Sequence, residues 1–317
     1  MSKIKKEQII LISIITAIVI TAGTLTAIIL TQSEARIGYT LLDRIDFVYD
    51  SENVSTLNLT IMNAEGSIFI SYKEELENIF EAENRFFGKR AAIVEDASNF
   101  TANEEGEFLQ ITYNAPKLYD SNDDRSFYNN LHITIRADMI VMYNITTESG
   151  DIYLVFDSVL TQTIIAKLNV FSSSGDMTLN FGDNTALDSS TLDTHTIAGK
   201  LDIIFDNVEL FSTIEMWNMT SRSGIIDFHF DQSEIICSRN ATFNIETDTG
   251  RISMRYDFPM ESGIQISAIT STGDISSDLE IPGPFTPYQN EFFPAEQNFF
   301  FTFQTGTGSI RIKEIVF

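Results

Sequence analysis

The chain of 317 residues is poor in cysteine, histidine and basic residues. Its one cysteine, Cys237, excludes an internal disulfide and a cysteine-based metal site. Basic residues number 20 against 45 acidic ones, which gives a formal net charge of −25. Because phosphate binding needs clustered Lys and Arg, we expect no nucleic-acid partner for so acidic a chain.

Short catalytic motifs are also missing. HExxH, the GxSxG nucleophile elbow, the P-loop and GxGxxG do not occur. The three histidines, His132, His195 and His229, are scattered, which disfavours a metal site. No His and Asp lie at a recognisable spacing to activate Cys237 as a nucleophile. The sequence therefore favours a protein that is not an enzyme and carries no cofactor.

One long apolar run lies near the N-terminus. Residues 9–30, IILISIITAIVITAGTLTAIIL, contain no charge, and 22 residues of helix span about 33 Å. Lys3, Lys5 and Lys6 precede the run, so the positive-inside rule places residues 1–8 in the cytoplasm and the rest outside. The alternative is a cleaved signal peptide, although its apolar stretch is usually shorter. We expect a single-pass anchor over residues 9–31 of a cell membrane.

An extracytoplasmic location agrees with the glycosylation sequons of the chain. They begin at Asn53, Asn58, Asn99, Asn144, Asn218 and Asn240.

A repeat of about 25 residues dominates the remainder. It is centred on eight glycines, Gly66, Gly150, Gly175, Gly199, Gly224, Gly250, Gly273 and Gly308. From Gly150 onward the spacings are 25, 24, 25, 26, 23 and 35. Internal periods of this kind indicate a repeat architecture.

Alignment on the glycine shows alternating apolar columns. Apolar residues recur two, four and six positions after it, as in Ile152, Leu154 and Phe156. They also recur seven and five positions before it, as in Tyr143 and Ile145, followed by Ser/Thr columns three and one before. Period-2 alternation predicts strands with one buried face. The parity changes at the glycine, which suits a sharp corner.

Each repeat is therefore predicted to be strand, glycine corner, strand and return loop. Stacked repeats would form an all-β fold, a β-solenoid resembling a single-stranded β-helix. A β-propeller is the alternative, but its blades need about 40 to 45 residues.

The chain divides accordingly. Residues 32–45 read as a linker and 46–130 as a less regular β region, in which residues 73–87 suit either a helix or strands. Residues 131–317 form the regular repeats, interrupted by the Pro- and aromatic-rich insertion 281–297. Its aromatic residues either cap the last coil or form an exposed loop that grips a partner.

The repeats NITTESGDIYLVF, NVFSSSGDMTLNF, NIETDTGRISMRY and QISAITSTGDISSDL, with LHITIRADM before them, resemble the "putative adhesin" family of bacterial and archaeal β-solenoids, or toastrack domains. The resemblance covers residues 131–317, and 46–115 more loosely. It implies an envelope-facing module and supplies no catalytic motif. The Asp after the glycine is kept only at Asp151, Asp176 and Asp274, which weakens a shared ligand site.

Asp151 and Asp176 are expected on adjacent coils, about 5 Å apart. Two stacked carboxylates could bind Ca²⁺ or act as an acid–base pair; alternatively, each Asp bonds locally in the turn. Asp123 and Asp124, in the polar loop 117–130, are a second calcium candidate.

We expect a membrane-anchored surface binding or adhesion module with an extracellular glycan or protein ligand. One alternative is an envelope structural or stress-sensing protein that acts through a membrane partner. The other is a carbohydrate-active β-helix enzyme that uses Asp151 and Asp176.

Overall fold

The computed structural model describes residues 40–315, except 75, 89–98, 116–126, 157–160, 189–190, 211–215, 233–239, 259–260 and 283–285. These residues form 21 strands and no helix, which confirms the all-β class. The predicted membrane anchor, residues 9–31, lies outside the described part. Within that part, no helix is long and apolar enough to cross a membrane.

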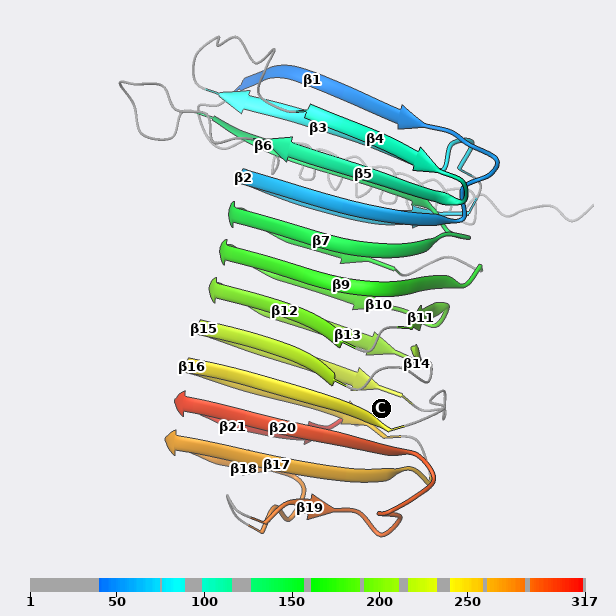
Figure 1. Cartoon of the computed structure of the whole chain (residues 1–317). Coiled ribbons are helices and arrows are strands. Elements are labelled where there is room, and N and C mark those ends of the chain that lie inside the picture. Colours follow the sequence, from blue (N-terminus) through cyan, green and yellow to red (C-terminus); the bar gives the residue numbers. More distant parts are fainter. Residues whose placement is uncertain are drawn as a thin grey trace, which may run out of the picture.

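The strands stack in two rows that meet at the glycine corners (Figure 1). The pre-glycine row follows this order: β4 (Asn99–Glu105), β5 (Phe108–Ala115), the first half of β2 (Thr56–Lys73), β7 (Ile140–Ser149), β9 (Thr163–Ser174), β12 (Thr191–Ala198), the first halves of β15 (Met216–Asp231) and β16 (Ala241–Asp257), β20 (Asn298–Thr307), β17 (Gly263–Thr272) and β19 (Tyr288–Gln289).

The post-glycine row follows the same coils on the other side of the corner. Its order is β1 (Thr40–Tyr49), β3 (Phe80–Gly88), β6 (Phe127–Arg136), the second half of β2, β8 (Ile152–Val155), β10 (Met177–Phe181), β13 (Leu201–Asp206), the second halves of β15 and β16, β21 (Ile310–Glu314) and β18 (Ile275–Ser277). The short strands β11 (Thr185–Leu187) and β14 (Glu209–Leu210) extend the stack at the start of β9.

Neighbouring coils pair in parallel and in register. Ile152 stands beside Met177, and Met177 beside Leu201, so one step of the stack is one repeat of the sequence. Strands β2 and β15 run unbroken through the corner and belong to both rows. For this reason the eight strands β2, β7, β9, β12, β15, β13, β10 and β8 close a ring of parallel pairings.

The order of the coils differs from the order of the chain at both ends. The coil of β5 and β6 lies outside β2, although it follows β2 in the sequence. The last coil, β20 and β21, inserts between β16 and the coil of β17 and β18. Four antiparallel pairings, β1–β3, β3–β6, β4–β5 and β17–β19, lie at these ends. Of these pairings only β4–β5 joins strands that are consecutive in the chain, so the antiparallel ends are built mainly from segments distant in the sequence.

The structure decides two stretches that the sequence left open, residues 73–87 and the insertion 281–297, and shortens the predicted polar loop. Residues 80–88, within the stretch suited to a helix or strands, form strand β3. The polar loop was predicted to reach residue 130, whereas β6 begins at Phe127. In the insertion, β19 pairs with β17 and Tyr288 packs against the core, while Phe292 is 43% exposed. Tyr288 therefore caps the last coil, as one alternative predicted, whereas Phe292 is exposed, as the other alternative predicted.

The core is a column of aliphatic and aromatic side chains between the two rows. Burial alternates along the strands and changes parity at the corner, as the columns predict. Phe156, Phe181 and Phe205 stack coil upon coil, with ring centroids 4.8 and 5.5 Å apart. Burying each such ring contributes about 1.5 to 3 kcal/mol.

Alkaline pH should destabilise this core. The Tyr72 and Tyr143 hydroxyl groups are hydrogen-bonded to each other in the interior, and burial raises the pKa of both tyrosines. Burial, with Glu314 and Asp278, raises the pKa of Tyr256 to about 12. Above pH ~10 the unfolded state loses phenol protons that the folded state keeps, so the free energy of unfolding falls as pH rises. Urea unfolding should show this decline, and it should be shallower in the Tyr72→Phe/Tyr143→Phe variant; a flat profile above pH ~10 contradicts it.

Candidate functional site

A hollow of about 680 Å³, here called the corner pocket, opens at the glycine corner of the N-terminal coils. Its walls are the backbone of Gly66, Gly150 and Gly175 and side chains that include Tyr128 and Asn130. The volume lies within the range of small-molecule sites. Because the walls belong to paired strands and their turns, the pocket is rigidly framed.

A stack of three aromatic rings crosses the outer face beside the pocket. Phe69 lies 4.6 Å from His132 and 4.8 Å from Tyr153, with ring planes within 9° and 3°. The three strands β6, β2 and β8 pair in register at these residues, which brings the rings together. Each pair contributes about 0.5 to 1.5 kcal/mol beyond its burial. The stack presents half-exposed ring edges next to polar groups.

The carboxylates of Asp151 and Asp176 hold neighbouring turns together. The Asp176 amide donates to Asp151 Oδ1 at 2.9 Å, and the Lys200 amide donates to Asp176 Oδ1 at 2.7 Å. The Asp of one coil thus binds the backbone of the next. This geometry gives the Ser/Thr-Gly-Asp motif a structural role between coils.

Asp151 also orients a pocket side chain. The Tyr153 hydroxyl donates to Asp151 Oδ2 at 3.3 Å. Burial raises the pKa of Tyr153, and the nearby charges of Asp151 and Asp176 raise it further. The phenol therefore stays protonated at neutral pH and remains a hydrogen-bond donor.

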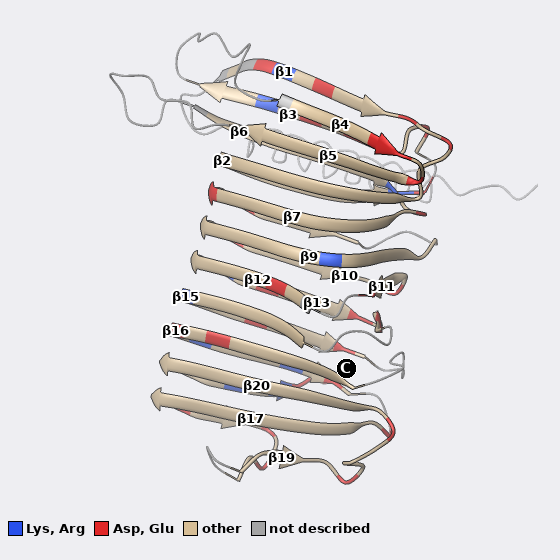
Figure 2. Ribbon diagram, in the orientation of Figure 1, with Lys and Arg blue, Asp and Glu red and all other residues tan. Residues whose placement is uncertain are grey.

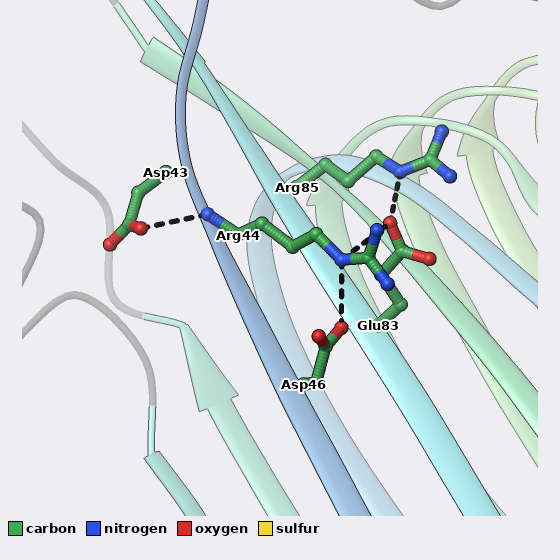
Figure 3. Close-up of polar contacts among 5 residues, drawn as sticks. All are labelled: Asp43, Arg44, Asp46, Glu83 and Arg85. Carbon is green, nitrogen blue, oxygen red and sulfur yellow. Dashed lines mark hydrogen bonds and ion pairs between the residues drawn. The ribbon is translucent and has the colours of Figure 1, made fainter.

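A second hollow of about 370 Å³ lies on the outer face of the N-terminal edge, between β1, β3 and β6. Figure 3 shows its ion pairs: Arg44 Nε lies 2.9 Å from Asp46 and 3.2 Å from Glu83, and Arg85 also pairs with Glu83. His132 lines this hollow and joins it to the aromatic stack. Exposed pairs of this kind contribute little stability, about 0 to 1 kcal/mol each.

The remaining predicted residues lie apart from the pocket. His195 and His229 lie on β12 and β15, distant along the stack from His132 on β6. Asp123, Asp124 and Cys237 lie outside the described residues. In the described part of the chain, no three His, Cys, Asp or Glu residues are grouped so that they could hold a metal ion.

The predicted glycosylation sites are spread over the stack. Asn53, Asn144 and Asn240 are exposed, Asn58 and Asn218 are half-buried, and Asn99 begins β4. The Asn218 amide already donates to Asp193 at 2.8 Å.

The aligned repeats did not lead us to predict the hydrogen bonds that link outward-facing side chains of adjacent coils. On the outer face of the pre-glycine row, Asn169 donates to Asn144 at 3.1 Å and Asn244 donates to Asn218 at 3.2 Å. The residue six positions before the glycine is Asn or Asp in five successive repeats, a signal visible in the sequence. The aromatic stack gives no such signal, because Phe69 on β2 and His132 on β6 are separated in the chain by far more than one repeat.

The corner glycines lie directly over one another. Seven of the eight have φ between +121° and +153°, and Gly224 does not. A Cβ at Gly175 would lie 2.1 Å from the carbonyl oxygen of Gly150.

The chain resembles known proteins at the level of solved structures. No protein-family model matches the sequence, and no curated protein matches it significantly. A "putative cell adhesion protein" from Clostridium sporogenes is 13% identical with a TM-score of 0.40, covering 86% of this chain and 99% of that one. "Putative adhesins" from Bacteroides fragilis and Parabacteroides distasonis are 10% and 11% identical, each with a TM-score of 0.31, covering 86% of this chain and 97% of theirs. The chain is thus similar to solved structures that are named as adhesins, the family that its repeats resemble.

Proposed function

We propose that the protein is a membrane-anchored, extracytoplasmic β-solenoid that acts as a surface binding module, and that its corner pocket binds a neutral carbohydrate. The aromatic stack beside polar pocket walls carries the proposal. Sugar rings present apolar C–H faces and hydroxyl groups, so they suit a pocket whose wall combines the apolar surface of Phe69 and Tyr153 with the polar groups of Asn130, Ser67 and Asp151. The apolar run over residues 9–31 would hold this surface outside the membrane.

A binding role accounts for the two central aspartates better than an enzymatic one. The carboxylates of Asp151 and Asp176 each accept a backbone hydrogen bond from the next coil. Each of these bonds ties one coil to the next, so the structural role already accounts for both carboxylates. We therefore assign both residues to the frame of the pocket.

Removal of the central ring should weaken glycan binding. The full chain, purified in detergent, would be applied to an array of neutral glycans and the best ligand measured by calorimetry. Phe69→Ala removes the ring between His132 and Tyr153, and we expect affinity to fall about tenfold or more.

Phe171→Ala is the matched control. Phe171 is also half-buried and stacks on a histidine, His195 at 5.3 Å, but on the pre-glycine row. It should leave affinity unchanged. The proposal fails if no neutral glycan binds, or if both variants lose affinity equally.

A further inference from the structure

Four basic side chains gather at the C-terminal end of the post-glycine row, here called the basic strip. Arg251 and Arg255 lie on β16, and Arg311 and Lys313 on β21. The two strands pair so that Ser253 stands beside Arg311 and Arg255 beside Lys313. All four side chains are exposed on the outer face. Figure 2 shows how few basic positions the other strands carry.

Most of the strip lacks counter-ions. Arg251 lies 3.8 Å from Asp227, a carboxylate that Lys200 already approaches to 3.0 Å. Among the described residues, Arg255, Arg311 and Lys313 form no ion pair. In a chain with 45 acidic and 20 basic residues, three unpaired cations on adjacent strands are unexpected from composition.

The arrangement also costs stability. Arg255 is directly opposite Lys313 on one side and His229 on the other, at a strand spacing of about 4.8 Å. Like charges directly opposite in a sheet are destabilising. The pKa of His229 is lowered by burial and by Arg255, so this histidine is neutral at neutral pH. Other cations of the described part are either paired, as Arg136 is with Asp138 at 2.6 Å, or carried singly on their strands, as Lys167 is on β9.

We propose that the basic strip binds an acidic polysaccharide through its carboxylate groups. Guanidinium groups bind carboxylates in a bidentate manner, and a bound polyanion would relieve the repulsion within the strip. Arg251 and Arg255 are four residues apart, about 13 Å along the strand, so one small anion cannot reach all four cations. A linear polymer with repeated carboxylates can. The strip and the corner pocket lie at opposite ends of one outer face, and neither site requires the other.

The test uses the full chain in detergent and polygalacturonate as the probe, with methyl-esterified polygalacturonate as the uncharged comparison. Binding by interferometry should require the free carboxylates and should weaken with added salt. In Arg255→Gln/Lys313→Gln we expect affinity to fall about tenfold or more. Thermal stability should be unchanged or slightly higher, because the like-charge pair is gone.

Two control variants make the result specific. Arg136→Gln removes a paired cation at the other end of the row and should bind normally. Phe69→Ala should also bind polygalacturonate normally, which separates this site from the corner pocket. The proposal is overturned if the wild-type chain does not bind polygalacturonate, or if the double variant binds as the wild type does. Binding of polyphosphate or phosphatidylglycerol vesicles in place of polygalacturonate would also overturn it.

Discussion

Gly175→Ala is expected to lower the free energy of unfolding by about 3 kcal/mol or more, because it forces two coils of the stack apart. The added Cβ would lie 2.1 Å from the carbonyl oxygen of Gly150, closer than atoms can approach. The φ of Gly175 is +153°, a conformation that costs an L-residue about 1 to 3 kcal/mol. Because the obstacle is backbone within a continuous parallel ladder, a side-chain rotation cannot relieve the clash.

Two other glycines separate steric clash from backbone strain. Gly106 has φ +63° but no atom within 4 Å of its Cβ position, so Gly106→Ala should cost only the strain, about 1 kcal/mol. Gly224 lies outside the left-handed region, yet its Cβ would lie 2.0 Å from the carbonyl oxygen of Gly199. We expect Gly175→Ala to be the most destabilising, followed by Gly224→Ala and then Gly106→Ala. Urea unfolding followed by circular dichroism measures all three. If Gly106→Ala is as destabilising as Gly175→Ala, close stacking is not the cause.

The sequence predicted the inward half of the stack well. Columns such as Ile152, Met177 and Leu201 are fully buried neighbours, because in-register parallel pairing places the same repeat position on adjacent coils. The corner could be predicted for a similar reason. A glycine that stacks on a glycine leaves a recurring glycine, about every 25 residues, in the sequence.

The candidate site could not be predicted in this way. Outward positions such as Phe69 and Tyr153 have no fixed residue type, and their contacts depend on which coils are neighbours. The coil of β5 and β6 lies outside β2, where it also pairs with the antiparallel strands β4 and β3, and this arrangement brings His132 onto Phe69. The basic strip arises similarly, since the last coil inserts beside β16 and sets Lys313 next to Arg255. Both proposed sites therefore lie where spatial order departs from chain order.

Trp217→Ala is expected to destabilise the core by about 3 to 5 kcal/mol. Trp217 is fully buried, with its ring centroid 5.0 Å from Phe205 and 5.5 Å from Phe181 in edge-to-face contact. Truncation leaves a cavity that neighbouring strands cannot fill, because their spacing is fixed by backbone hydrogen bonds. Met216→Ala is the matched control. Met216 is the preceding residue and 40% exposed, so its loss should cost about 0.5 kcal/mol or less.

Trp217→Phe should retain most of the stability that Trp217→Ala loses. The Trp217 Nε1–H group is buried without a hydrogen-bond partner among the described residues, and an unpaired buried donor costs about 1 to 3 kcal/mol. Phenylalanine removes this donor and keeps an aromatic ring against Phe205. The gain offsets the smaller ring volume, and we expect unfolding free energy within about 1 kcal/mol of wild type. Circular dichroism in urea provides the measurement, since both variants lack the single tryptophan. Equal destabilisation by Phe and Ala would show that the indole Nε1–H is satisfied and that ring volume alone determines the cost.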